Sequence, residues 1–159
     1  MNYITNGQIC LNGHIISHNT KNIRVENYCS KCGSKTITAC QQCSSPIKGG
    51  ISYEDEYTYD FEECPKPQYC RDCGMPFPWT TKILTNSVAL LALDEELPLE
   101  IKEIIRNAIP NLLVDTPDTP VAIAEYRQGI AKCSEIVRNS LYQLLVDVLS
   151  DSIKKALFG

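Results

Sequence analysis

The stretch "NYCSKCGSKTITACQQCSSPIKG", residues 27–49, places four cysteines within fifteen residues as two C-x-x-C pairs. Two sulfurs of one such turn can reach a single metal ion while backbone N–H groups point at the thiolates. The glycine after the second cysteine supplies the positive φ that the turn needs, a role that Gly33 fits and Ser44 does not. The stretch therefore predicts two half-sites for metal, each of which needs a second pair of ligands.

Two further pairs lie outside this stretch and complete the set. They are Cys10 with His14 in "CLNGH" and Cys70 with Cys73 in "CRDCG". Eight ligands make two tetrahedral sites, and an odd total of nine clustered cysteines argues against a disulfide framework. The predicted metal ligands are Cys10, His14, Cys29, Cys32, Cys40, Cys43, Cys70 and Cys73.

The ligand types predict two structural zinc ions per chain. Tetrahedral sets of thiolate and imidazole favour zinc, although an all-cysteine set also suits iron. Four protein ligands leave no open position for water or substrate, so a catalytic role for the metal is not expected. Two further residues could take part in metal or redox chemistry: His18 as a replacement for His14, and Cys64 as an exchangeable ligand or redox thiol. Cys133 is instead expected in the apolar core.

The residues around these pairs resemble the double zinc ribbon family. "YCSKCG" looks like the end of one ribbon, seven residues from Gly33 to Ala39 follow, and "CQQC" opens the next, which "QYCRDCGMPFPW" closes. The whole arrangement, with "ICLNGH" first and a helical tail last, is also similar to an uncharacterised family of bacterial proteins. The resemblance implies a sequential pairing, in which the first and second pairs share one metal and the third and fourth pairs share the other. A cross-braced pairing stays open, because seven extended residues can separate two metals by about 20 Å.

Composition divides the chain into a small metal-bound β domain, residues 1–79, and an all-α helical domain, residues 80–159. Eight of the nine cysteines and both histidines lie in the first part, with short β-branched stretches between turn signals. We expect helices at about 81–94, 98–109 and 119–157, with Thr80 as the first N-cap and Pro98 and Pro120 at the starts of the others. Gly129 is the one expected weak point of the third helix.

The predicted third helix carries an apolar stripe that two short helices cannot cover. Its members alternate by three and four, which is typical of a buried helix face: Ile123, Tyr126, Ile130, Cys133, Val137, Leu141, Leu144 and Val148. We therefore expect a partner helix, from a second copy of the chain or from another protein. The alternative is a compact three-helix bundle in which the last helix breaks at Gly129.

Several classes of function are not expected from this sequence. The start of the chain lacks a signal peptide and no apolar run is long enough to span a membrane, so we expect a cytoplasmic protein. No Ser-His-Asp set or phosphate-binding glycine loop is present, and the acidic run "YEDEYTYDFEE" reads as a solvated loop rather than a calcium site. A non-enzymatic interaction or adaptor protein is the preferred hypothesis. A nucleic-acid-binding regulator is the less favoured alternative, because the sequence pI is near 5.2.

Overall fold

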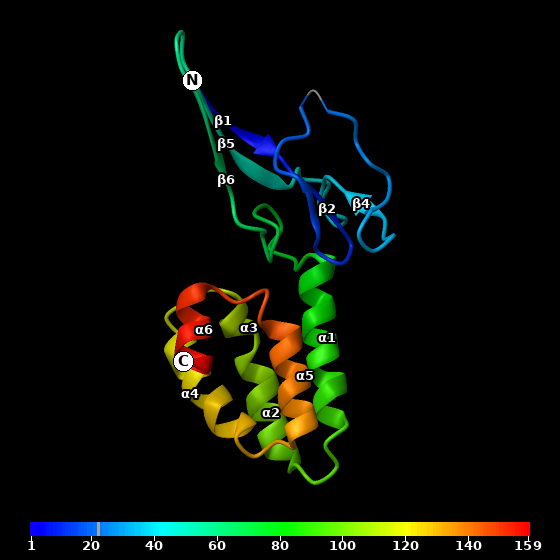
Figure 1. Cartoon of the computed structure of the whole chain (residues 1–159), viewed down its shortest axis with the longest axis vertical. Coiled ribbons are helices and arrows are strands. Elements are labelled where there is room, and N and C mark those ends of the chain that lie inside the picture. Colours follow the sequence, from blue (N-terminus) through cyan, green and yellow to red (C-terminus); the bar gives the residue numbers. More distant parts are fainter. Residues whose placement is uncertain (22) are drawn as a thin grey trace. The chain divides into compact units, whose positions relative to one another are not determined.

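The computed structural model describes residues 1–21 and 23–159, which divide into two compact units. The cysteine-rich unit comprises Met1–Thr81 and the helical unit comprises Lys82–Gly159. Antiparallel strands form the first unit and helices form the second, so the chain combines small sheets with helices (Figure 1). In the described residues, no helix has the length and apolar character that crossing a membrane requires.

Two small antiparallel sheets organise the cysteine-rich unit. One has the strand order β1-β5-β6, from Asn2–Asn6, Lys48–Glu54 and Tyr59–Glu63. The other has the order β3-β2-β4, from Ile15–Ser17, Gln8–Cys10 and Thr36–Ile37. The apolar core of this unit is small and includes two of the predicted metal ligands: its buried residues are Ile9, Cys40, Ile47, Cys70, Phe77 and Trp79.

The acidic run from Tyr53 to Glu63 forms a hairpin, so the prediction of a loop was wrong, whereas most of the run is exposed to solvent as expected. Strands β5 and β6 pair from Gly50 with Glu63 to Glu54 with Tyr59. The turn between them is held by Asp55, whose carboxylate accepts hydrogen bonds from the N–H groups of Tyr57 and Thr58. Aromatic residues favour strands, and the many acidic side chains of this run obscured that preference.

Six helices follow the sheets. They are α1 (Pro78–Ala92), α2 (Leu99–Ala108), α3 (Pro110–Leu113), α4 (Thr119–Ile130), α5 (Glu135–Leu145) and α6 (Asp151–Phe158). Helix α1 begins at Pro78, before Thr80, so the prediction of Thr80 as its N-cap was wrong. The Thr80 hydroxyl instead donates a hydrogen bond to the Gln68 carbonyl. The predicted helix 98–109 is observed as α2, and α3 follows it directly.

The single long helix predicted at 119–157 was wrong, because the chain breaks twice within that range. The first break follows Gly129, as the alternative had it, and Ser134 then caps α5 by accepting a hydrogen bond from the Val137 N–H. Ser150 caps α6 in the same way, through the Ile153 N–H. Both serines satisfy N–H groups that a continuous helix would bond internally, and we did not identify them as caps in the sequence.

These breaks let the apolar stripe fold onto one core within the helical unit. Tyr126, Cys133, Val137 and Leu141 are buried there, and the other stripe residues pack against them. Gly129 allows α4 to approach α2, since a Cβ atom built on it would lie 2.5 Å from Ile105 Cγ1. The stripe therefore needs no partner helix, and the argument that an over-long helix requires one no longer applies.

Candidate metal sites

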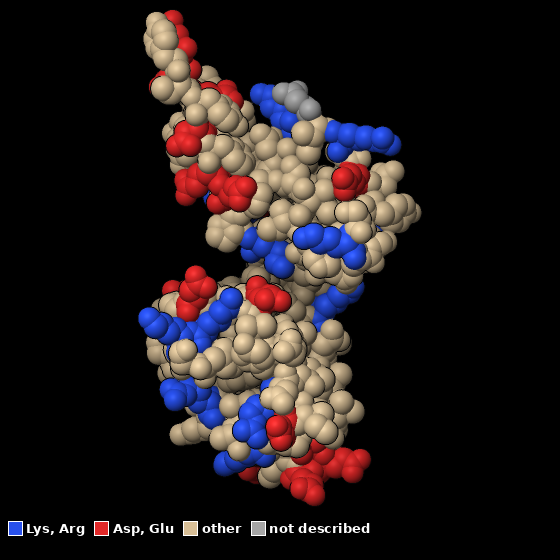
Figure 2. Space-filling model, viewed as in Figure 1, with Lys and Arg blue, Asp and Glu red and all other residues tan. Residues whose placement is uncertain are grey.

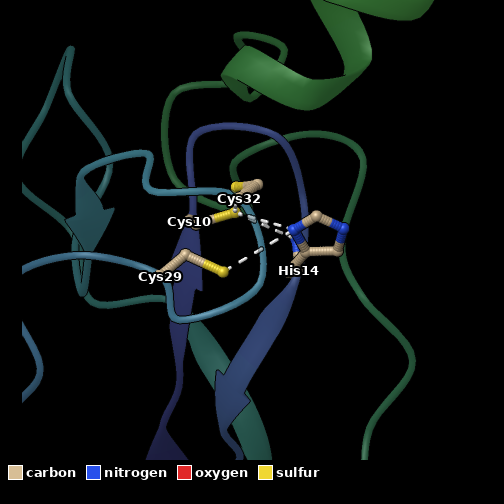
Figure 3. A group of neighbouring side chains, drawn as sticks. All are labelled: Cys10, His14, Cys29 and Cys32. Atoms are coloured by element: carbon tan, nitrogen blue, oxygen red, sulfur yellow. Dashed lines mark hydrogen bonds between the residues drawn. The ribbon is translucent and has the colours of Figure 1, made fainter.

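The first cluster gathers one imidazole and three thiols from three segments. Cys10 ends β2, His14 precedes β3, and Cys29 and Cys32 lie in the turn before β4. Their ligand atoms all lie within 4.8 Å of one another. His14 Nδ1 faces the sulfurs, 3.5 Å from Cys10 Sγ and 3.7 Å from Cys29 Sγ (Figure 3).

The second cluster consists of four thiols from two C-x-x-C turns. Cys40 and Cys43 precede β5, while Cys70 and Cys73 follow β6, and their sulfurs also lie within 4.8 Å of one another. Cys40 Sγ is 3.7 Å from Cys73 Sγ, and Cys43 Sγ is 3.6 Å from Cys70 Sγ. The Ser45 hydroxyl also donates to the Asp72 carboxylate, which joins the two turns beside the sulfurs.

These separations suit a tetrahedral metal. Four sulfurs held at about 2.3 Å from a central zinc lie about 3.8 Å from one another, which is close to the observed distances. The residues are grouped in the sequential manner, first pair with second and third pair with fourth. Both clusters could therefore hold a metal ion with the four ligands that each provides.

The three C-x-x-C turns share one backbone arrangement. In each, the N–H of the first cysteine donates to the carbonyl five residues later, and the N–H four residues on donates back to the first cysteine, as with Cys29 and Gly33. The first cysteine is buried and the second is exposed in each turn. Backbone N–H groups also approach the sulfurs: that of Gln42 lies 3.4 Å from Cys40 Sγ and that of Asp72 lies 3.5 Å from Cys70 Sγ.

The position after each C-x-x-C pair has a positive φ, whatever residue occupies it. Gly33 has φ 72° and Gly74 has φ 73°, as the turn requires. Ser44 has φ 64°, so the expectation that it does not fill the glycine role was wrong. A residue other than glycine is strained by roughly 1 kcal/mol at such a φ. The turn of the second cluster therefore holds Ser44 in a strained backbone conformation.

Hydrogen bonding favours the thiolate form at two ligand positions. The Asn12 side-chain amide donates to Cys32 Sγ over 3.4 Å and lowers the pKa of that thiol to about 5. The Cys73 and Asp72 backbone N–H groups lower the pKa of Cys70 to about 7. Burial raises the pKa of Cys10, so a nearby cation would stabilise its thiolate form. Each cluster thus includes one thiol whose lowered pKa favours the thiolate form that a metal binds.

The remaining histidine and two cysteines, His18, Cys64 and Cys133, lie outside both clusters. The His18 ring bonds through Nδ1 to the Gly49 carbonyl at 2.9 Å, and its Nε2 lies 3.5 Å from the Glu63 carboxylate. Cys64 is half-buried, and its backbone N–H donates to Gly49. Cys133 is buried in the helical core. None of these three belongs to a group whose ligand atoms lie within metal-binding reach in the described residues.

Lys66 was missed in the sequence, because nothing in "CPKPQYC" indicates where its side chain lies. Its ammonium donates to the carbonyl of Gly13, the residue before His14, over 3.1 Å. A Cβ atom on Gly13 would lie 2.8 Å from Lys66 Nζ and 2.9 Å from Trp79 Cβ, and Gly13 also has φ 92°. Burial lowers the pKa of Lys66, while the charge of the nearby Cys10 thiolate opposes that decrease.

A comparison with protein families places the chain. The matching family model is described as "Uncharacterized protein conserved in bacteria (DUF2321)" and covers residues 3–157, so both clusters and most of both units fall within the match. No curated protein and no solved structure matches the chain. The chain therefore belongs to this family, as the resemblance to an uncharacterised bacterial family had indicated.

Proposed function

We propose that this member of the DUF2321 family is a non-enzymatic zinc-binding adaptor. Two zinc ions hold the cysteine-rich unit folded as a double zinc ribbon, and the helical unit associates with a second copy of the chain. The observation that carries the metal part is the closed ligand set of each cluster, four protein atoms within 4.8 Å. A zinc ion with four protein ligands has no position left for water or substrate, so its role is structural.

The donor atoms favour zinc over the alternatives. The first cluster offers three sulfurs and His14 Nδ1, a combination typical of structural zinc. The second cluster offers four sulfurs, which zinc also prefers and which iron can use. A zinc ion bound in such a site would stabilise the folded state of the unit.

The surroundings of the two histidines support a protein without catalytic activity. His14 faces the thiols of the first cluster, and His18 is hydrogen-bonded to the Gly49 carbonyl. Within residues 1–21 and 23–159, neither ring is hydrogen-bonded to a serine, threonine or tyrosine hydroxyl or to a thiol outside the clusters. Acyl and glycosyl transfer need a general base positioned next to a nucleophile. Among the described residues, neither histidine forms such a pair, so we propose a function without catalysis.

Charge makes protein the preferred class of partner over nucleic acid. The cysteine-rich unit has seven lysines and arginines against eight aspartates and glutamates. Seven cluster thiolates with two zinc ions add three further negative charges. Figure 2 shows acidic side chains gathered over the β5–β6 hairpin, where a phosphate backbone would be repelled.

The surface of α1 supports association of the helical unit with a second copy. No charged residue occurs from Ile83 to Leu93, and Val88 and Leu93 are 43% and 69% exposed. A hollow of about 230 Å³ between α1 and α2 and another of about 630 Å³ between α1 and α5 flank this face. A ridge between two grooves is self-complementary, since the ridge of a symmetry-related copy can occupy a groove.

Native mass spectrometry of the untagged protein tests this proposal, because it reports metal identity, metal count and oligomer mass together. We expect two zinc ions per chain in a dimer. Cys32→Ser and Cys73→Ser should each remove one zinc, and Leu93→Lys should give a monomer that keeps both zinc ions. A chain that carries iron or no metal would contradict the metal part. A wild-type monomer would contradict association with a second copy and would direct the search to another protein partner.

A further inference from the structure

One short segment, residues 66–70, contacts the first cluster and belongs to the second. At its start, the Lys66 ammonium donates to the Gly13 carbonyl, within the turn that presents Cys10 and His14. At its end, Cys70 is a ligand of the second cluster. Three residues separate these two positions, so one short segment of chain joins the second cluster to the turn of the first.

The middle of the segment is fixed on both sides. The Pro67 carbonyl accepts a hydrogen bond of 2.8 Å from the Trp79 indole, and the Gln68 carbonyl accepts one of 2.8 Å from the Thr80 hydroxyl. Trp79 is buried and stacks on Phe77, with ring centroids 4.8 Å apart. Trp79 also lies against Gly13, so the segment and the indole together cover the turn of the first cluster.

Charge gives this contact its significance. Three thiolates, a neutral imidazole and Zn²⁺ carry a net charge of −1, and the half-buried Lys66 ammonium lies next to that charge. Its hydrogen bond also fixes the peptide that joins Gly13 to His14 and so orients the imidazole ligand. Groups that orient and neutralise metal ligands in this way typically change metal affinity by about 10- to 100-fold.

We propose that Lys66 couples the two metal sites: metal at the second cluster holds residues 66–70 in place, and Lys66 then strengthens metal binding at the first. Lys66 acts as a positioning residue for Cys10 and His14, without touching the metal. Because such coupling is reciprocal, metal at the first cluster strengthens binding at the second by the same factor. This inference rests on the proposed binding of two zinc ions.

The test is a titration of the metal-free full-length protein with less than two equivalents of zinc, followed by native mass spectrometry. For the wild type, we expect chains with no metal and with two metals to dominate, because binding is positively cooperative. For Lys66→Met, which replaces the ammonium with an unbranched apolar side chain, we expect chains with one metal to accumulate and first-cluster affinity to fall about tenfold. Cadmium-113 NMR assigns the occupied cluster, since a three-sulfur, one-nitrogen site and a four-sulfur site give separate resonances.

Matched variants separate coupling from a general loss of charge or of folding. Lys66→Arg should restore cooperativity, and Lys35→Met, which removes the same charge from the same unit, should leave it unchanged. Cys73→Ser should weaken the first cluster about as much as Lys66→Met does, and the double variant should be no weaker than Cys73→Ser alone. Wild-type cooperativity in Lys66→Met, or equal effects of Lys35→Met, would overturn the inference. A wild type that binds no zinc would instead overturn the proposed function.

Discussion

The two units of this chain differ in how much apolar surface they bury. The apolar cluster of the helical unit contains sixteen buried residues, whereas that of the cysteine-rich unit contains six within the described residues, including the predicted metal ligands Cys40 and Cys70. Apolar burial maintains the helical fold, whereas the cysteine-rich unit brings four possible ligand atoms close together in each of its two clusters. The units should therefore respond to different perturbations.

Metal removal should produce the largest difference between them. Structural zinc sites contribute about 10–16 kcal/mol of apparent binding energy at neutral pH, which a core of six residues cannot replace. We expect a strong chelator to unfold the cysteine-rich unit, with loss of Trp79 burial seen by fluorescence, while far-UV circular dichroism retains the helical signal. Equal loss of helical signal on chelation would show that the two units fold as one.

A substitution at Gly129 should produce the opposite selectivity. Alanine in a helix is ordinarily more favourable than glycine by about 1 kcal/mol. At Gly129, however, a Cβ atom would lie 2.5 Å from Ile105 Cγ1, so overpacking between α4 and α2 should cost about 1–3 kcal/mol. Thermal unfolding of Gly129→Ala should show a less stable helical unit with the zinc count unchanged. A more stable variant would mean that α2 moves aside without penalty.

A reciprocal pair of substitutions compares the two clusters on a smaller scale. Ser44→Gly should stabilise the second cluster by roughly 1 kcal/mol, because φ 64° is strained for serine. Gly33→Ser should destabilise the first cluster by a similar amount, since no atom lies within 4 Å of a Cβ there and only the backbone opposes it. Chelator competition measures both variants. Changes of the same sign in both would refute the interpretation that φ decides the effect.

The smallest expected effect is a pH dependence confined to the helical unit. The Asp94 carboxylate accepts a hydrogen bond of 2.7 Å from the Ser134 N–H, which lowers the pKa of Asp94 below the usual 3.8. The resulting stabilisation is complete above the usual pKa and is lost as pH falls through the lower folded value. Asp94→Asn should flatten the acid limb of the helical unfolding curve, whereas exposed Glu95→Gln should not. An unchanged limb in Asp94→Asn would assign acid sensitivity elsewhere.

The candidate metal ligands were easier to predict from this sequence than the helix boundaries and backbone conformations. The spacing of three C-x-x-C pairs and of Cys10 with His14 indicated the eight residues that the structure brings into two clusters, because ligand type and short turns are local properties. The breaks at Ser134 and Ser150 could not be separated from ordinary helix positions, since the apolar stripe continues across both. Ser44 escaped prediction because serine rarely adopts a positive φ, whereas the hydrogen bonds of the C-x-x-C turn place this position at φ 64° as they do Gly33 and Gly74.

Long-range contacts account for the remaining differences. Lys66 approaches Gly13 from a point more than fifty residues later, and no periodicity or spacing encodes that contact. The hairpin of β5 and β6 depends on a turn that Asp55 stabilises, while its acidic composition suggested a solvated loop. Resemblance to a double zinc ribbon indicated which pairs lie together in one cluster but provided no information about these neighbours.

The sequential grouping of ligands also sets an order of events during synthesis. Every ligand of the first cluster lies within residues 10–32, and every ligand of the second lies within residues 40–73, so the two closed loops do not overlap. Because chains emerge from the N-terminus and early segments fold first, the first cluster can acquire its metal while the second is still being translated. Lys66 and Trp79 emerge only later, so they can cover Gly13 only after every residue of the first cluster has been synthesised.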